Sequence, residues 1–196
     1  MRKTTMALLA GLMLMGAASA AQAETKTFVI DDTHTTVGFT VRHMFTNLKG
    51  VFHHFSGALE LDTKNGTVAA GKGVVEIASV DTGHEKRDGH LQSPDFFNVE
   101  KYPTMTFVVK QSRKVGDDLE ISGDFTLLGV TKPVTFKGRF LGVGNDPWGN
   151  TRAGLTASTR INRKDYGMDF NKVLDTGGLL IGDQVDINLE IEAVQK

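Results

Sequence analysis

Apolar and polar residues alternate along most of the chain from Lys26 onward. This period of two is typical of β-strands that bury one face and expose the other. The last such run, residues 185–193, alternates without interruption, and its opposite face is entirely polar. About nine strand-like segments can be counted, joined by connections too short for a parallel crossover, which needs roughly a dozen residues or more. The pattern therefore predicts an all-β fold in which one antiparallel sheet closes on itself.

The phase of the alternation assigns one side of each segment to the interior. Residues 51–61 are interpreted as one long strand, whose phase is fixed because a shift by one residue would turn His54 and Glu60 inward. Residues 73–80 are predicted to form the next strand. The inward positions that we predict are Val37, Phe39, Val41; Val51, His53, Phe55, Gly57, Leu59, Leu61; Met105, Phe107, Val109; Leu119, Ile121, Gly123, Phe125, Leu127; Val134, Phe136, Gly138, Phe140; Ala153, Leu155, Ala157, Thr159, Ile161; and Val185, Ile187, Leu189, Ile191, Ala193.

One stretch, residues 81–107, breaks the alternation and carries helix and turn signals. Thr82 lies three residues before Glu85, the spacing of a capping box at a helix start. We therefore predict a short helix from about Gly83 to Leu91.

A second helix-start signal, Ser93-Pro94, follows directly, because proline is favoured at the first helical position. We expect a short turn there that presents Phe96 and Phe97. The predicted fold is thus an antiparallel β-barrel with a short helical insertion at about 83–98.

The first 23 residues have the pattern of a secretory signal peptide. Arg2 and Lys3 precede the apolar run 7–18, and Ala21-Gln22-Ala23 places small residues at the cleavage positions. The run is too short to span a bilayer, which takes about 20 residues, so we expect no transmembrane segment. One mature domain, residues 24–196, is predicted in the periplasm. It has no cysteine for a disulfide or a lipid anchor.

The charge of the mature chain argues against nucleic acid as a partner. The whole sequence has 22 basic and 23 acidic residues. Removal of Arg2 and Lys3 with the signal peptide leaves 20 basic residues and a formal charge of −3. A nucleic-acid-binding protein more often has a basic excess.

The histidines do not form a recognisable metal motif. His84-Glu85 followed by His90 is similar to the metalloprotease helix signature, but that signature needs histidines four residues apart. A spacing of six places the two rings about 240° apart around a helix. His53 and His54 are neighbours on a strand and point to opposite faces. No metal or cofactor is predicted.

Motifs of common enzyme chemistry are missing from the sequence as well. The chain has no cysteine nucleophile, no G-x-S-x-G elbow and no glycine-rich phosphate loop. One enzymatic alternative stays open, a periplasmic enzyme that acts on a lipid or small substrate through His84, Asp88 and His90. An enzyme of this kind would lose turnover by orders of magnitude on replacement of His90 by alanine.

Twelve phenylalanines accompany one tryptophan and two tyrosines, and several lie on inward phases. They fit either a packed core, at about 1.5–3 kcal/mol for each buried ring, or the wall of a cavity, since a barrel of about eight strands admits side chains or one small ligand. Glycines within strands favour the cavity, because each leaves a gap. They are Gly38, Gly57, Gly123, Gly138 and Gly154. A bulky residue at Gly123 is then expected to weaken binding more than folding.

Several short motifs occur in order along nearly the whole mature chain. They are Thr33-His34-Thr35-Thr36-Val37-Gly38-Phe39, Val41-Arg42-His43, Gly50-Val51-Phe52, Phe55-Ser56-Gly57, Ser79-Val80-Asp81-Thr82, Arg87-Asp88-Gly89-His90-Leu91, Ser93-Pro94-Asp95-Phe96-Phe97, Lys101-Tyr102-Pro103, Gly123-Asp124-Phe125-Thr126-Leu127 and Gly129-Val130-Thr131-Lys132-Pro133-Val134. Together they resemble the YceI-like polyisoprenoid-binding family. Arg163 with Asp165-Tyr166-Gly167 also fits, although Tyr166 stands where the family pattern has phenylalanine.

The resemblance implies an extended lipocalin-like barrel with a helix against it, exported and enclosing a long apolar ligand such as an isoprenoid chain or isoprenoid quinone. Related members take other long-chain amphiphiles, and no catalytic residue carries over. We therefore predict a carrier or sequestering protein that is not an enzyme. A stress-related structural protein with an incidental ligand stays open. A homodimer is expected if the sheet leaves an exposed edge strand.

Two groups of side chains are predicted to contact the ligand. Apolar side chains are expected to line the lumen: Phe39, Val41, Phe55, Phe96, Phe97, Phe107, Phe125 and Phe136. Basic side chains are expected at the mouth, where they tune the choice of head group: Arg42, His43, Arg87 and His90. The alternation leaves open which end of the barrel is the mouth.

Overall fold

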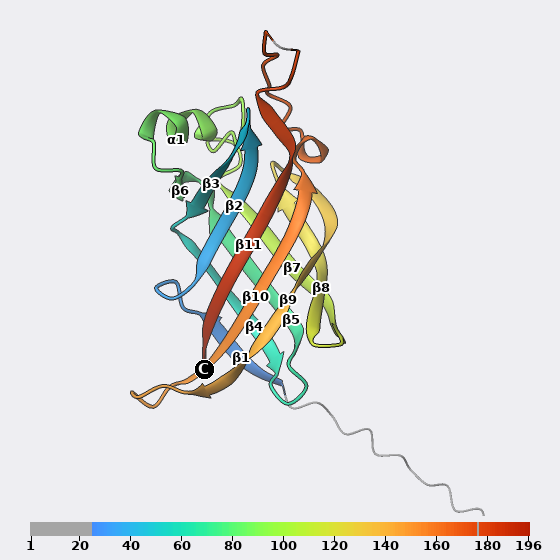
Figure 1. The fold of residues 1–196 in the computed structure, drawn as a ribbon. Helices are drawn as coiled ribbons and strands as arrows, with labels where there is room; N and C mark the ends of the chain where they lie inside the picture. The colour runs from blue at the N-terminus through green and yellow to red at the C-terminus, as the bar shows by residue number, and fades with distance from the viewer. Residues whose placement is uncertain (1–24, 176) are drawn as a thin grey trace, which may run out of the picture.

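The computed structural model describes residues 25–175 and 177–196, so the predicted signal peptide (1–23) lies outside the described residues. These residues form one antiparallel sheet of eleven strands, one α-helix and two 3₁₀ turns. The strands are β1 (Thr25–Ile30), β2 (Thr36–His43), β3 (Thr46–Phe52), β4 (Phe55–Asp62), β5 (Thr67–Glu76), β6 (Val80–Asp81), β7 (Thr104–Val115), β8 (Asp118–Leu127), β9 (Val130–Asn145), β10 (Thr151–Asn162) and β11 (Ile181–Gln195). The helix is α1 (Glu85–Gln92), and the turns are η1 (Ile77–Ser79) and η2 (Arg163–Tyr166). Figure 1 shows an elongated barrel with α1 beside one end.

The sheet closes because β1 pairs with β4 on one side and with β11 on the other. β1 and β2 both pair with the same edge of β11, one after the other. On their other side, β1 pairs with β4 and β2 pairs with β3. Breaks at residues 31–35, 53–54 and 77–79 thus divide three long strands in two. Eleven strands with three such breaks make a closed barrel of eight long segments, which confirms the predicted barrel with a helical insertion. No described helix is long and apolar enough to cross a membrane.

The inward phases predicted for β8 and β10 are confirmed by burial. Their buried apolar residues are Leu119, Ile121, Phe125 and Leu127 in β8, and Ala153, Leu155, Ala157 and Ile161 in β10. Period two predicts these strands well because each has one face in the interior and one in water.

The phase predicted for residues 51–53 is wrong. Phe52 is the buried residue, and His53 lies outside with Nε2 3.0 Å from Oδ2 of Asp81. Residues 53 and 54 form the break between β3 and β4, so the alternation restarts at Phe55.

The strand predicted at 73–80 is also wrong in its bounds. β5 begins earlier, at Thr67, and ends at Glu76, where η1 turns the chain before the short strand β6. Backbone bonds from Glu76 to His54 and from His53 to Ser79 tie this turn to the break between β3 and β4. The two interruptions therefore lie side by side in the wall.

The helix forms where the sequence predicts it, but its cap is different. His84 is the N-cap, and its Nδ1 accepts from the backbone N–H of Arg87 at 3.4 Å. Thr82 does not cap the helix, because its hydroxyl donates to Oδ1 of Asp88 at 2.5 Å. The turn after Ser93 buries both Phe96 and Phe97 against the barrel.

The barrel interior has two parts of different character. One end is filled by a packed cluster that includes Phe28, Leu61, Leu119, Leu155 and Ala193, each at most 1% exposed. The half nearer α1 is surrounded by a second cluster in which phenylalanines predominate. Both interpretations of the phenylalanine-rich interior therefore apply, each to one half of the barrel.

Candidate functional site

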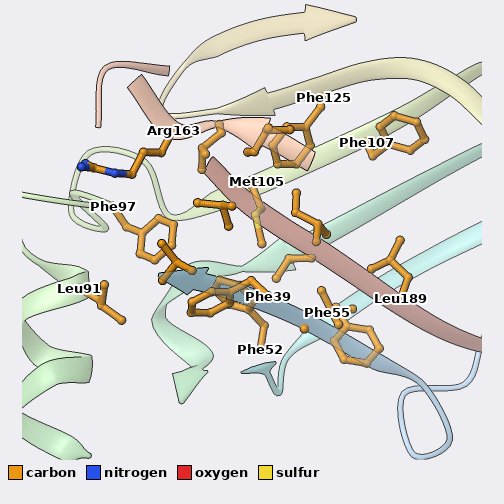
Figure 2. Close-up of a pocket in the computed structure, with 18 of the residues that line it drawn as sticks. Phe39, Phe52, Phe55, Leu91, Phe97, Met105, Phe107, Phe125, Arg163 and Leu189 are labelled. Carbon is orange, nitrogen blue, oxygen red and sulfur yellow. The ribbon is translucent and has the colours of Figure 1, made fainter. Parts of the chain in front are cut away.

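A cavity of about 450 Å³ lies among the side chains of the second cluster, and Leu59 and Phe136 of the packed cluster also border it. Its volume is within the range of about 300–1,000 Å³ that is typical of small-molecule sites. Strand residues of alternating phase form most of its wall, and Leu91 of α1 and Phe97 of the following turn cover one side (Figure 2). The lining is overwhelmingly apolar.

Aromatic contacts hold the wall in place without filling the centre. The Phe39 and Phe52 rings lie 5.7 Å apart between centroids, and Phe52 meets Phe97 edge to face at 5.9 Å. Such pairs add about 0.5–1.5 kcal/mol beyond the area that they bury. Phe39 also rests on Gly50, where a Cβ atom would come within 2.4 Å of its ring. Gly50 thus lets the ring come close to the backbone of β3.

Gly73 leaves the clearest gap in the lining. It pairs with Phe107 of β7 and with Gly57 of β4, so its side-chain position shares their inward face. A Cβ atom at Gly73 would meet nothing within 4 Å. The hollow therefore begins directly at the backbone of β5.

Gly123 does not have this role, contrary to the sequence-based expectation. A Cβ atom there would lie 2.3 Å from the Val108 carbonyl oxygen and 2.7 Å from the Phe107 ring. A bulky residue at Gly123 would disrupt the β7–β8 pairing rather than fill the cavity.

The structure brings most of the predicted site residues together. All eight apolar candidates border the cavity: Phe39, Val41, Phe55, Phe96, Phe97, Phe107, Phe125 and Phe136. Of the basic candidates, His43, Arg87 and His90 also border it. Arg42 does not, because it alternates to the outer face of β2 and donates from Nη1 to the Met44 carbonyl at 2.7 Å.

Several lining residues were missed because they lie in the irregular segment 162–182. Among them are Arg163, Met168, Phe170, Lys172 and Leu180. A segment without alternation gives no phase from which an inward face can be predicted. The phenylalanine and aliphatic content of this segment was the available signal.

Arg163 is the most unusual of these residues, because its side chain is buried in an apolar wall. Only 2% of the residue is exposed. Its Nε donates to the Gly182 carbonyl at 3.0 Å and its Nη1 to the Met168 carbonyl at 2.5 Å. Burial lowers the pKa of the guanidinium, although Asp183, 3.4 Å from Nη2, opposes that shift. Arg163 therefore ties the irregular segment to the start of β11.

The charged residues that border the cavity share one sign. Among the described residues they are Lys72, Arg87, Arg163 and Lys172, with no carboxylate. This is unexpected in a chain with a formal charge of −1. Lys72 alternates with the inward Gly73, so its exposed side chain lies on the outer face of β5, and Asp183 lies 3.4 Å from Nη2 of Arg163. Arg87 and Lys172 are therefore the two cations of the lining that would favour a negative group on a molecule that enters.

The residues of the enzymatic alternative do not converge on a common point. His84 caps α1, and Asp88 accepts hydrogen bonds from the backbone and hydroxyl of Thr82. His90 lies 2.8 Å from Asp95 and packs edge to face on Phe96. Each group is engaged in its own local contact, so they do not form the shared geometry of a nucleophile and its base.

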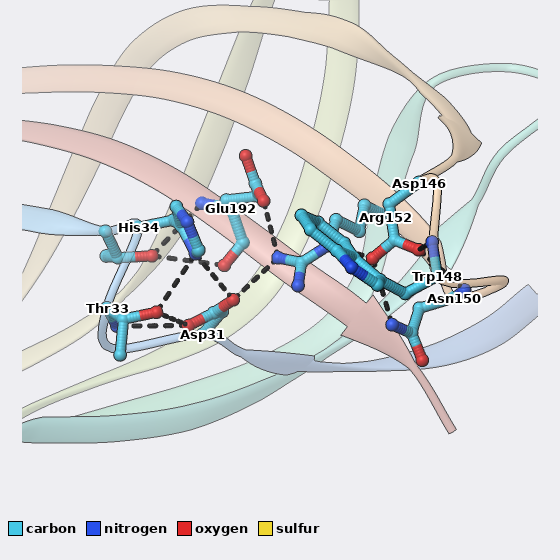
Figure 3. A network of polar contacts seen from close by, with 9 residues as sticks. Asp31, Thr33, His34, Asp146, Trp148, Asn150, Arg152 and Glu192 are labelled. Atoms are coloured by element: carbon cyan, nitrogen blue, oxygen red, sulfur yellow. Dashed lines mark hydrogen bonds and ion pairs between the residues drawn. The ribbon is translucent and has the colours of Figure 1, made fainter.

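A polar network lies outside the cavity, where the β1–β2 break meets the β9–β10 hairpin (Figure 3). Arg152 donates to Asp31 at 2.6 Å, to Asp146 at 2.8 Å and to Glu192 at 2.6 Å. The ligand atoms of Asp31, His34 and Glu192 lie close enough together for a metal ion. The guanidinium already neutralises two of these groups, so we interpret the cluster as a structural clamp.

Hydrogen bonds in this network shift its pKa values strongly. Bonds from Thr33, Arg152 and His34 hold the pKa of Asp31 well below its usual range. Bonds from Arg152 and Asn150 do the same for Asp146. In return, the bonds to its carboxylate partners raise the pKa of Arg152. Asp31, Asp146 and Arg152 therefore stay charged at neutral pH.

Comparison with known proteins gives consistent relatives. The YceI-like domain family matches residues 28–193. Protein YceI of Escherichia coli O17:K52:H18 (strain UMN026 / ExPEC) is 39% identical over 197 residues, covering 100% of both chains. UPF0312 protein plu2095 of Photorhabdus laumondii is also 39% identical and covers 100% of this chain and 99% of its own.

Solved structures show the same barrel. The YceI protein of Campylobacter jejuni gives a TM-score of 0.70 at 25% identity, covering 96% of this chain and 99% of its own. BcnA of Burkholderia cenocepacia gives 0.73 at 21% identity, covering 84% and 99%. A polyisoprenoid binding domain from Saccharophagus degradans gives 0.62 at 17% identity, covering 88% and 100%. These last two are similar in fold alone. Since the family match spans almost all of the described residues and the relatives align from end to end, this chain belongs to the YceI-like family.

Proposed function

We propose that this protein is an exported lipid-binding protein, which holds an isoprenoid or another long-chain amphiphile in the barrel cavity for transport, storage or sequestration. The observation that carries the proposal is an apolar hollow of about 450 Å³ beside a densely packed core in the same barrel. The packed cluster includes Phe28, Leu61 and Leu155, which do not border the hollow, so the hollow is a local feature of the barrel. The fold shared with a polyisoprenoid binding domain supports an isoprenoid-type ligand.

Burial of the tail supplies most of the affinity in this proposal. Each buried CH₂ group contributes about 0.8 kcal/mol, so a five-carbon isoprene unit contributes about 4 kcal/mol before the costs of binding. A few units approach the practical affinity limit near −18 to −21 kcal/mol. The polar end of the ligand therefore sets selectivity rather than overall affinity.

The basic lining supports a preference for ligands with an acidic head group. Arg87 of α1 and Lys172 of the 171–180 loop both border the cavity. A phosphate or carboxylate there would gain charge-assisted hydrogen bonds, whereas an ammonium group would be repelled. The tail would then extend toward the packed half of the barrel.

A direct test is titration of the mature protein with a fluorescent long-chain fatty acid and with its amine counterpart. The proposal predicts saturable binding of one acid per chain and weaker binding of the amine. Absence of saturable uptake of either probe would contradict the cavity function. Equal affinity for both would contradict the head-group preference alone.

Export and assembly belong to the proposal as well. The periplasmic location rests on the signal pattern of residues 1–23, and the intact mass of the protein from its host should correspond to a chain that begins at Glu24. A homodimer remains a prediction, to be measured by sedimentation velocity. In the closed barrel, the last strand in the sheet order is β6, which has only two residues. A dimer formed by pairing the β6 strands of two chains would therefore have few backbone hydrogen bonds.

A further inference from the structure

Exposed apolar side chains lie on neighbouring loops at the α1 end of the barrel. Phe45, in the β2–β3 hairpin, is 84% exposed, and Val173 and Leu179 are 73% and 38% exposed. The backbone N–H of Met44 donates to the Leu180 carbonyl at 2.8 Å, which ties the hairpin to the second loop. Val173 and Leu179 form an isolated β-bridge within that loop. We call Phe45, Val173 and Leu179 the mouth patch.

The mouth patch adjoins the cavity lining along the chain. Its members lie within two residues of lining residues on both loops: His43 beside Phe45, Lys172 beside Val173, and Leu180 and Ile181 beside Leu179. Figure 1 places the loop of residues 171–180 at the extreme tip of the barrel, beyond the ends of the strands. A flat surface that met the barrel at this end would meet this loop first, and the β2–β3 hairpin is hydrogen-bonded to its base at Leu180.

The charge around the mouth patch is positive. Residues 42–49 contain Arg42 and Lys49 and no acidic residue, and residues 171–180 contain Lys172 and Asp175. All three cations belong to exposed residues. Exposed apolar side chains on segments with three cations and one carboxylate match the interfacial region of an anionic bilayer, where apolar groups enter the headgroup layer and lysine and arginine meet lipid phosphates.

We propose that the mouth patch docks the barrel onto an anionic membrane surface, with Phe45 and Val173 inserted at headgroup depth and the cavity open toward the lipid. This inference rests on the proposed function, because docking gives a lipid ligand a path that avoids water. A lipid surface fits better than a protein partner. A stable protein interface buries about 1,200–2,000 Å² with a contiguous core, whereas the mouth patch is three side chains on loop tips.

The chain offers a matched control for this proposal. Trp148 is 81% exposed, almost as much as Phe45, but lies in the β9–β10 hairpin at the opposite end of the barrel (Figure 1). If exposed aromatic side chains bound vesicles without regard to position, both residues would contribute. Of these two aromatic residues, the proposal assigns a contribution only to Phe45.

The test is co-sedimentation of the mature protein with vesicles of phosphatidylcholine alone, or with about a third phosphatidylglycerol as anionic lipid. We expect binding to the anionic vesicles that weakens as salt is raised. The double variant Phe45→Ser, Val173→Ser should bind at least about tenfold more weakly, equivalent to about 1.4 kcal/mol. Trp148→Ser should bind like the wild type. Arg42→Gln with Lys49→Gln should lose the preference for anionic vesicles.

Three results would overturn the docking proposal. The wild type could remain in the supernatant with both vesicles, Trp148→Ser could weaken binding as much as the double variant, or sedimentation velocity could show a dimer that Phe45→Ser abolishes, which would assign the mouth patch to a second copy of the chain. All variants replace exposed side chains, and circular dichroism checks that they fold.

Uptake of the fluorescent fatty acid without vesicles separates this proposal from the proposed function. A double variant that takes up the probe normally but no longer binds vesicles supports both. Wild-type protein that takes up the probe but ignores vesicles contradicts docking alone. Protein that binds vesicles but takes up no probe contradicts the cavity function and leaves docking supported.

Discussion

Replacing Gly73 by phenylalanine should fill the cavity while leaving its wall intact. Gly73 faces the interior from β5, opposite Phe107 and Gly57. A Cβ atom there meets no neighbour within 4 Å, and the backbone does not have the positive φ that would strain a side chain. The new ring should therefore enter the hollow without displacing a packed group.

The size of the effect follows from the hydrocarbon that the ring displaces. A phenylalanine side chain occupies the place of roughly seven tail carbons, worth at most about 5–6 kcal/mol at 0.8 kcal/mol each. Because the tail can shift along the cavity, we expect affinity to fall about 10- to 100-fold, or about 1.4–2.8 kcal/mol. Stability should stay equal or rise, since a ring in a strand buries apolar surface and glycine is unfavourable there.

The assay is titration with the fluorescent fatty acid together with thermal unfolding. Gly144→Phe is the matched control, because Gly144 lies on the exposed face of β9, has open space at its Cβ position and no positive φ. The control should bind like the wild type. Unchanged affinity in Gly73→Phe would show that lipid does not occupy this space. Equal losses of affinity and stability would show that the space is packed in solution.

Other variants test the remaining parts of the structure. Arg152→Gln should lower the melting temperature at neutral pH, and the gap to the wild type should close below about pH 4. Carboxylates whose pKa is lowered in the fold stabilise it above their unfolded value of about 3.9 and lose that effect as pH falls through the lowered value. A gap that stays constant down to about pH 2 would contradict the clamp. Leu155→Ala, in the packed half, should destabilise by about 2–5 kcal/mol in urea titrations with unchanged lipid affinity. Phe39→Ala should destabilise the protein less than Leu155→Ala, because the Phe39 ring already borders the cavity, and it should bind lipid more weakly. A larger loss of stability in Phe39→Ala, with unchanged lipid affinity, would refute the distinction between a packed cluster and a cavity. Arg163→Met should cost about 1–3 kcal/mol for each backbone carbonyl left without its donor, and unchanged stability would show that these bonds contribute nothing.

The barrel could be predicted from the sequence because each long strand has one wet and one dry face. That condition holds along β8 and β10, where alternation and burial agree residue by residue. It fails at residues 53–54, where the chain leaves the ladder and changes phase by one. Phe52 faces the interior because the break at residues 53–54 shifts the phase between β3 and β4. No local sequence pattern marks this break.

The cavity could be predicted only as an alternative. Inward phenylalanines look the same in sequence whether they meet across a core or lie against a wall. The difference depends on tertiary contacts, such as the space that Gly50 leaves for the Phe39 ring. Arg163 and Phe170 could not be placed in the lining at all, because they belong to an irregular segment whose path is set by hydrogen bonds to β11.

The most direct measurement is mass spectrometry of the protein purified from a host that exports it, first intact under native conditions and then after organic extraction. The proposed function predicts one long-chain amphiphile per protein molecule, released by extraction and absent from Gly73→Phe protein prepared in the same way. Native protein at the mass of the bare chain, with an extract free of long-chain lipid, would contradict it.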